Sequence, residues 1–426
     1  MDDNSVQNNL NVLVIAYYFP PMGLSGVQRT LKFVKYLPDF GWNPVVLTTD
    51  NKSYYAYDET LMNDIAEGTL VYRASENKKQ SKIKSKPRKF PNYLKQKAGR
   101  YFLQIFKQPD TKIHWKKYAL AKAEEIIRQH DIKAIFATAP PFTDFLIGKE
   151  LSEKFDIPLL IDYRDSWVDN PFHFFPTMWH KNYNINLEKA VLTMAEKAFV
   201  TTRAAKEQLL MRYRFLSHDD IIILPHGYDP DDFKDSKVST GNRKLTFTHS
   251  GLFQDDRTPK YFLKAMNLFL KENKDARQNI EIRFIGLMRT SHLRLIKRYK
   301  LNDVSFLPGY LEHQEAVNHL IESDVLWMTV NDTIRTPGKL YEYIGAMKPI
   351  LYIGPKGPMS NLVSDTKAGF IADTKNVKEI KSIIENIYKL WRTGTLPAAD
   401  KTNAENYNRK NLTGSLARFL SLHSKM

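Results

Sequence analysis

The stretch from residue 11 to residue 48 reads NVLVI-AYYFPPMGLSG-VQRTLKFVKYL-PDFGWN-PVVLT and decides the fold. Its first five residues are apolar enough for a buried strand, and proline and glycine then exclude regular structure over residues 16–26. Apolar residues recur at helical spacing over residues 27–37, and an apolar run at 44–48 predicts a second strand. A strand, a loop, a helix and a strand in this order predict a parallel α/β sheet.

The same alternation recurs along the chain and predicts two doubly wound Rossmann-like halves that face a central crevice. Strands are expected at 133–138, 157–161, 198–202 and 221–224, and a second series runs from 245–248 to 349–353. Ligands of such sheets bind at the carboxyl ends of the strands. The predicted domains are residues 1–225 with a basic insertion at about 78–117, residues 226–405, and a helix at 406–426 that returns to the first domain.

Composition narrows the class of protein. The chain has 426 residues, no cysteine and a net charge of +16. Disulfides and thiolate metal sites are therefore excluded. The first ten residues are polar and acidic, and no apolar run reaches the length of a membrane span. We expect a cytoplasmic protein that binds membranes at most peripherally.

Three loop or helix-start positions are candidates for binding a phosphorylated ligand. Gly23 and Gly26 precede a helix, where free backbone N–H groups favour an anion. Arg257 follows a strand of the second half and can neutralise a diphosphate leaving group. Glu342 lies about one turn into a helix that Thr336 is expected to cap, with Pro337 at its first position. The alternatives are a tight turn, a solvated loop and a surface glutamate at a helix N-terminus.

Several segments together resemble the GT4-type family of retaining GT-B glycosyltransferases. They follow the order of that family along nearly the whole chain: YYFPPMGLSGVQR (17–29), DYRDSW (162–167), LPHGYD (224–229), TPGKLYEY (336–343) and the tail from Tyr407 to Leu422. The resemblance implies transfer of a sugar from a nucleoside-diphosphate sugar to a glycan or lipid-linked acceptor, as in cell-surface polysaccharide synthesis.

The resemblance also implies roles for single residues. Glu342 would hold the donor ribose, and Gly26, Arg257 and Lys339 would surround the diphosphate, assisted by backbone N–H groups near Gly338. The loop containing Pro308, Gly309 and Tyr310 would contact the base. Asp165 would face the anomeric carbon or the acceptor hydroxyl as the catalytic carboxylate. Neither a metal nor a cofactor is expected, because positive side chains and dipoles neutralise the leaving group in GT-B enzymes.

Two positions depart from the family pattern. Ile334 stands where many relatives carry a second glutamate, and Leu252 stands where a basic residue is often found. A different donor sugar, an inverting or epimerase-like relative, and a degenerate non-catalytic partner protein therefore stay open. His226 and His249 are candidates for lining the crevice, with packing as the ordinary alternative.

The segment from Lys78 to Lys117 carries fourteen lysines and arginines and a single acid, Asp110. Aromatic and apolar residues are interleaved with these cations, as in an amphipathic basic helix that binds an anionic membrane surface. A nucleic acid could also bind such a cation-rich segment, but the chain shows no recognisable nucleic-acid-binding module. A solvated loop is the alternative. We expect a peripheral association with the inner face of the membrane and no nucleic-acid partner.

Overall fold

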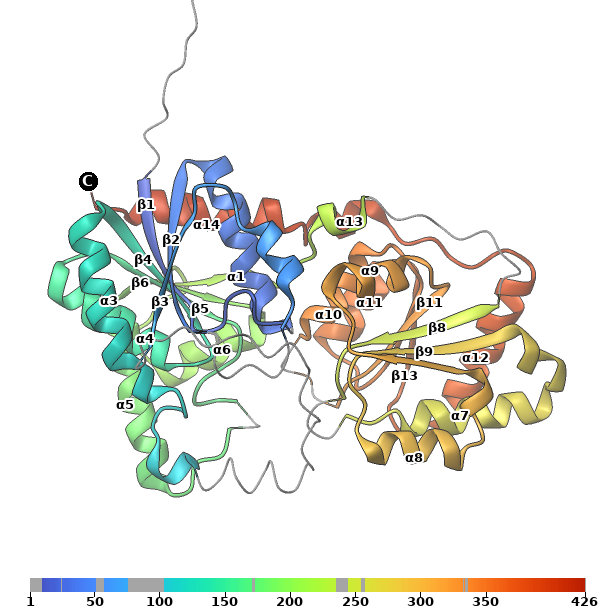
Figure 1. Cartoon of the computed structure of the whole chain (residues 1–426). Coiled ribbons are helices and arrows are strands. Elements are labelled where there is room, and N and C mark those ends of the chain that lie inside the picture. The colour runs from blue at the N-terminus through green and yellow to red at the C-terminus, as the bar shows by residue number, and fades with distance from the viewer. Residues whose placement is uncertain are drawn as a thin grey trace, which may run out of the picture. The chain divides into compact units, whose positions relative to one another are not determined.

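The computed structural model describes residues 10–23, 25–50, 57–75, 103–170, 173–234, 244–253, 257–331, 333 and 336–425. The chain forms two compact units (Figure 1): Met1–His226 with Arg409–Met426, and Gly227–Asn408. The predicted α/β class with two parallel sheets is confirmed, and each unit is considered by itself below.

The first unit is built on a parallel sheet that has seven strands in the described part of the chain, in the order β3-β2-β1-β4-β5-β6-β7. These strands are β1 (Leu10–Ile15), β2 (Trp42–Thr49), β3 (Leu70–Ala74), β4 (Ile132–Ala139), β5 (Leu159–Tyr163), β6 (Ala195–Val200) and β7 (Ile221–Ile223). The helices are α1 (Ser25–Tyr36), α3 (Lys116–Gln129), α4 (Thr143–Phe155), α5 (Met178–Met194), α6 (Arg203–Arg212) and α14 (Arg409–His423).

Strand β1 shows why both faces of this sheet are apolar. Val12 and Val14 pack with α1 and α14 on one face, whereas Leu13 and Ile15 pack with α3 and α4 on the other. A strand buried on both faces has no polar alternation. This explains the uninterrupted NVLVI run and places the C-terminal helix α14 on the first unit.

The second unit repeats the design with six parallel strands among its described residues, in the order β10-β9-β8-β11-β12-β13. They are β8 (Leu245–Ser250), β9 (Ile280–Ile285), β10 (Ser305–Gly309), β11 (Val325–Thr329), β12 (Ile350–Ile353) and β13 (Gly369–Ala372). The helices are α7 (Lys260–Glu272), α8 (Thr290–Arg298), α9 (His313–Ile321), α10 (Gly338–Gly345), α11 (Pro358–Asp365), α12 (Val377–Arg392) and α13 (Lys401–Glu405).

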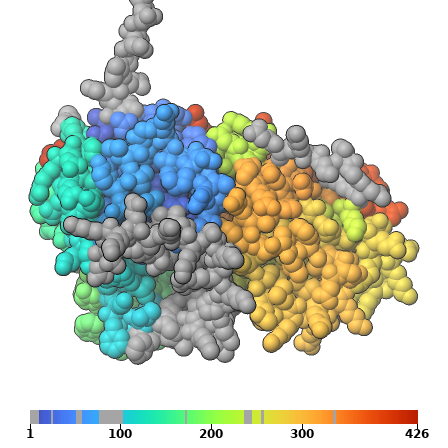
Figure 2. Space-filling view, viewed as in Figure 1, coloured from blue at the N-terminus to red at the C-terminus, as the bar shows by residue number. Residues whose placement is uncertain are grey.

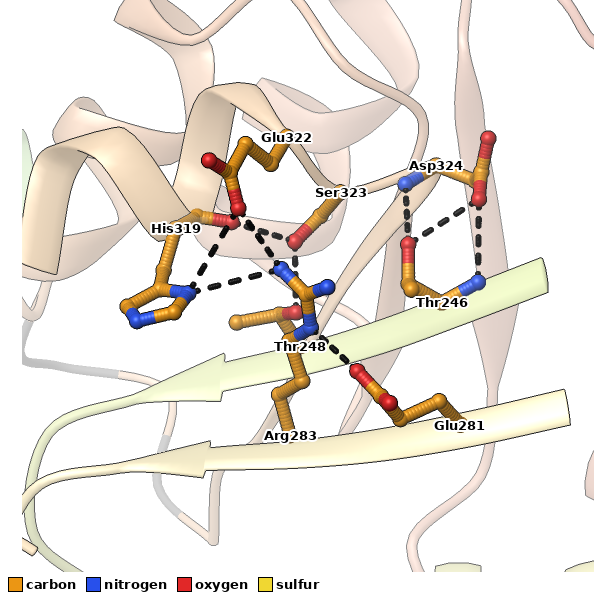
Figure 3. Close-up of polar contacts among 8 residues, drawn as sticks. All are labelled: Thr246, Thr248, Glu281, Arg283, His319, Glu322, Ser323 and Asp324. Carbon is orange, nitrogen blue, oxygen red and sulfur yellow. Dashed lines mark hydrogen bonds and ion pairs between the residues drawn. The ribbon is translucent and has the colours of Figure 1, made fainter. Parts of the chain in front are cut away.

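The second unit contains a polar layer where the end of α9 meets β8 and β9 (Figure 3). Arg283 pairs with Glu281 at 2.6 Å and with Glu322 at 3.1 Å. At the start of β8, the Thr246 N–H and hydroxyl both donate to Asp324 at 2.9 Å. Buried polar groups are stable only when such partners are present. This layer therefore fixes the end of α9 and the segment that follows it against the sheet.

Two strands and one helix start were not predicted correctly. The edge strands β3 and β13 were missed, because their short segments lack a strong apolar run. The helical pattern in the sequence predicts a helix only around Leu187 to Glu196, whereas α5 begins at Met178, where the Thr177 hydroxyl caps it by accepting the His180 N–H. Aromatic and asparagine residues in its first turns hid this start from the helical pattern.

Candidate functional site

Both sheets reverse their strand order at one point, between β1 and β4 in the first unit and between β8 and β11 in the second. The crevice at the carboxyl ends of such strands is where open α/β sheets bind ligands. The predicted site residues lie in the segments that follow these strands or their neighbours: Gly23 and Gly26 after β1, Asp165 after β5, Arg257 after β8, Tyr310 after β10, and Lys339 and Glu342 in α10.

The loop between β1 and α1 is fixed by Arg164. Its guanidinium donates to the carbonyls of Gly26 and Pro140, which tie this loop to the one that follows β4. A Cβ at Gly26 would meet its nearest neighbour, Arg164, at 4.0 Å, and Gly26 is exposed in the first turn of α1. Packing within the described chain therefore does not require glycine here, which leaves room for a ligand to approach the backbone.

Arg29 and Asp162 form a buried pair beneath this loop. Arg29 Nη2 lies 2.8 Å from Asp162 Oδ1, and Nε lies 3.0 Å from Oδ2. The same guanidinium donates to the carbonyls of Leu224 and Pro225, and the Thr138 hydroxyl donates to Asp162 at 2.9 Å. A bidentate pair with these further partners fixes α1 against the ends of β4, β5 and β7. Asp162 is therefore a structural carboxylate, whereas Asp165 lies half-buried in the following loop.

Asp144 is a buried carboxyl that the sequence analysis did not single out. It lies in the first turn of α4, fully inaccessible to solvent, and its Oδ2 accepts the Tyr17 N–H at 2.8 Å. Burial raises the pKa of Asp144 well above its usual range, and Oδ1 has no hydrogen-bond partner in the described structure. A neutral carboxyl here holds the chain just after β1. An acid three residues after a Pro-Pro turn was the available signal.

His226 lies half-buried at the end of the first unit, after β7. Burial lowers its pKa well below the usual range, and Arg29, Arg409 and Arg164 lower it further. The imidazole is therefore neutral at physiological pH.

Three glycines line the carboxyl edge of the second sheet. Gly251, Gly286 and Gly309 follow or end β8, β9 and β10 with φ of 119°, 128° and 88°. The Gly251 N–H donates to Ile285 and the Gly286 N–H donates to Gly309, each at 2.8 Å. A Cβ on Gly286 would lie 3.0 Å from the Gly251 carbonyl oxygen. Side chains are therefore excluded from this edge, and its backbone stays accessible to a ligand.

Helix α10 carries the predicted cation and carboxylate next to these glycines. Lys339 Nζ lies 2.5 Å from Glu342 Oε2, and the Glu342 side chain is only 6% exposed. The Tyr343 hydroxyl accepts the Ser250 N–H at 2.7 Å, which fixes α10 against the end of β8. A Cβ on Gly251 would touch the Lys339 stem at 3.6 Å. The structure thus brings Gly251, Lys339 and Glu342 together.

The predicted cap of this helix was wrong. Pro337 is the N-cap residue and Gly338 the first helical residue, without a side-chain cap. The Thr336 hydroxyl is buried and has no hydrogen-bond partner in the described structure. The preference of proline for helix starts located the helix but placed its first residue one position too early. The N–H groups of the first turn of α10 are therefore not capped by Thr336.

Other predicted residues have different surroundings. Arg257, Leu252, Pro308 and Tyr310 are half-buried in loops or at a strand end. His249 stacks on Phe253 at 4.1 Å between ring centroids, and its Nδ1 lies 3.1 Å from the Trp327 carbonyl oxygen.

Burial lowers the pKa of His249 to about 4, so this neutral ring packs in the core of the second unit. Ile334 lies outside the described residues. Among the residues that are described, there is no group of three or more histidines and carboxylates that could hold a metal ion.

The cation-rich segment from Lys78 to Lys117, called the basic tract below, is described only at its C-terminal end, residues 103–117. Here Asp110 accepts the Thr143 N–H at 3.0 Å and its hydroxyl at 2.9 Å. Lys112 lies over the Tyr17 ring at 4.9 Å. The end of the tract is therefore attached to the start of α4 and to the segment after β1. None of the described helices is both long and apolar enough to cross a bilayer.

Most of the second unit matches a model of a known protein family. Residues 231–409 match the family model of glycosyl transferases group 1. This segment contains Arg257, Gly309 and α10, which the sequence analysis assigned to the donor. No curated protein matches the chain in sequence.

Solved structures match over nearly the whole chain. Sucrose-phosphate synthase from Thermosynechococcus elongatus is 11% identical with a TM-score of 0.67, covering 97% of this chain and 99% of that one. Anabaena HepE in complex with UDP and glucose is 14% identical with a TM-score of 0.64, covering 97% and 100%. A putative UDP-N-acetylglucosamine 2-epimerase from Listeria monocytogenes is 12% identical with a TM-score of 0.60, covering 97% and 96%. The fold is GT-B.

Proposed function

We propose that the chain is a glycosyltransferase that moves a sugar from a nucleoside-diphosphate sugar to a glycan or lipid-linked acceptor, with retention, in cell-surface polysaccharide synthesis. One observation carries this proposal. Helix α10, which bears Lys339 and Glu342, contacts Gly251 within the segment that matches glycosyl transferases group 1. The UDP and glucose in the HepE complex are consistent with such a donor.

The proposed chemistry breaks the bond between the anomeric carbon and the diphosphate oxygen and forms one to the acceptor hydroxyl oxygen. Negative charge accumulates on the departing diphosphate, where Lys339, Arg257 and the N–H groups at the start of α10 would stabilise it. Glu342 would accept hydrogen bonds from the ribose hydroxyls, with Pro308, Gly309 and Tyr310 at the base.

In the first unit, Gly23 and Gly26 would allow a phosphate group of the substrate to approach the backbone at the start of α1. Asp165 would orient the attacking hydroxyl or stabilise positive charge on the sugar ring. The lysines and arginines of Lys78–Lys117 would hold the enzyme on the anionic inner face of a membrane, where lipid-linked acceptors are located.

A thermal-shift screen with UDP, GDP and their sugars tests the proposal. A nucleotide present at a hundred times its Kd stabilises the protein by about 2.7 kcal/mol and therefore raises the melting temperature. Absence of a shift with every nucleotide would contradict the enzyme proposal and favour a non-catalytic partner protein. With the donor in hand, the anomeric configuration of the product by NMR separates retention from inversion, and an epimerised free nucleotide sugar would identify an epimerase.

A further inference from the structure

An exposed apolar surface lies at one end of the first unit, where α5 begins. It consists of Ile105, Phe106, Phe174, Met178, Trp179 and Tyr183, and we name it the α5 patch. Phe106, Met178 and Trp179 are 72%, 67% and 65% exposed. Several large apolar side chains exposed together on one surface indicate a binding site, whereas scattered single ones do not.

Two segments distant in sequence are held together to form the α5 patch. His180 Nε2 lies 3.1 Å from the Ile105 carbonyl oxygen, and Asn184 Nδ2 donates to Gln108 at 2.6 Å. Both residues are on the buried side of α5, which leaves Trp179 and Tyr183 outward and stacked on each other at 5.5 Å. The segments lie at the same end of the first unit in Figures 1 and 2. These contacts between the two segments therefore hold the residues of the α5 patch in place.

The α5 patch lies at the same edge of the sheet as the candidate acceptor site. Helix α5 leads into β6, which is parallel to β5, so its first residue lies at the carboxyl ends of the strands. The same edge holds Asp165, and Asp110 attaches the segment after Ile105 and Phe106 to the start of α4. A partner bound to the patch would lie beside the acceptor side of the first unit.

We propose that the α5 patch inserts its aromatic and apolar side chains into an anionic lipid bilayer. Residues 103–109 and 173–187 contain no acidic residue, and residues 103–109 belong to the cation-rich segment Lys78–Lys117. Tryptophan and tyrosine favour the boundary between lipid head groups and acyl chains. Two copies paired through this patch would bring together the cations that adjoin it, Lys107 and Lys181, which disfavours a dimer.

This surface deepens the proposed function, because it would bring the acceptor edge of the first unit to the lipid that carries the acceptor. It also divides membrane binding into two parts. The cations of the tract provide an attraction that salt screens, and the α5 patch provides an apolar attraction that salt does not screen.

Sedimentation of the full chain with vesicles of phosphatidylcholine and phosphatidylserine tests the proposal. Phe106→Ser and Trp179→Ser should each lower the partition coefficient about tenfold and together remove the binding that survives high salt. Leu422→Ser is the matched control, since Leu422 is also 65% exposed in the first unit. It should bind as the unchanged protein does. Neutralising the lysines between Lys78 and Lys97 should remove only the salt-sensitive part.

Brominated acyl chains provide a direct readout. They should quench tryptophan fluorescence in the unchanged protein and less in Trp179→Phe. Vesicle binding by the Phe106 and Trp179 variants equal to that of the control would overturn the proposal, as would a loss of self-association in those variants. The UDP thermal shift should be the same in all variants, so failure of the patch proposal and failure of the transferase proposal give different results.

Discussion

The two sheets share one strand order but place their charges differently at the carboxyl edge. In the first unit, Arg29 and Asp162 are buried against each other, and Arg164 donates to two backbone carbonyls. In the second unit, Lys339 and Glu342 lie on one turn of α10, beside glycines that keep the backbone accessible. The charges of the first edge hold loops in place, whereas those of the second pair with each other within one helix.

The largest expected effect on stability is that of Asp162→Ala in the first unit. The substitution leaves Arg29 as a buried, unpaired cation, which costs about 3–5 kcal/mol of the free energy of unfolding. Urea denaturation measures the loss.

Asp39→Ala is the control, because Asp39 pairs with Lys410 at 2.8 Å in the same unit with both side chains well exposed. That variant should unfold much like the unchanged protein. An equal effect of the two substitutions would show that the Arg29–Asp162 pair does not stabilise the first unit.

A buried acid in the first unit should make stability depend on pH. Burial raises the pKa of Glu188 to about 7, although the Tyr213 hydroxyl donates to it at 2.8 Å. Because the folded pKa lies above the unfolded value, the stabilisation is full below pH of about 4.5 and is lost as the pH rises through about 7.

Unfolding free energies measured from pH 5 to pH 8 should therefore fall by up to about 3 kcal/mol from this residue alone. Glu188→Gln should be flatter over this range, and Glu207→Gln, on an exposed helix position, should follow the unchanged protein. A Glu188→Gln protein with the original pH dependence would show that another group titrates.

Periodicity predicted most of the fold because both sheets are buried on both faces. The apolar runs at β1, β11 and β12 are typical of strands buried in a core, and glycine or proline marks the loops after them. The edge strands β3 and β13 lack this signal, because their short, partly exposed segments contain no strong apolar run. The start of α5 was missed because its cap, Thr177, lies among aromatic residues.

The candidate site was predictable only where a motif lies on one element. Gly338, Lys339 and Glu342 are neighbours along α10, so the spacing of the motif already places them together. Asp144 and Gly286 meet their partners, Tyr17 and Gly251, only after the sheets form. Likewise, the motif places Lys339 and Glu342 on one helix, but the presence of a lysine and a glutamate in the sequence does not specify that their side chains pair.

The smallest expected effect is in the second unit, and it tests whether the Lys339–Glu342 pair binds a ligand. Glu342→Ala should weaken UDP or GDP binding by about 1.5–3 kcal/mol, the range for losing hydrogen bonds to a charged group. Lys339 is 22% exposed and can turn to solvent, so the fold should survive this change.

The matched control for Glu342→Ala is Glu385→Ala, which removes another lysine-paired carboxylate of the same unit, 3.1 Å from Lys381 on α12. Titration calorimetry of the three proteins measures the affinities. If both variants bind the nucleotide as the unchanged protein does, Glu342 does not hold the ribose, and the pair on α10 would be as structural as Arg29 and Asp162. If only Glu342→Ala weakens binding, the two edges differ in function as well as in geometry, because one carboxylate holds the chain and the other holds the donor.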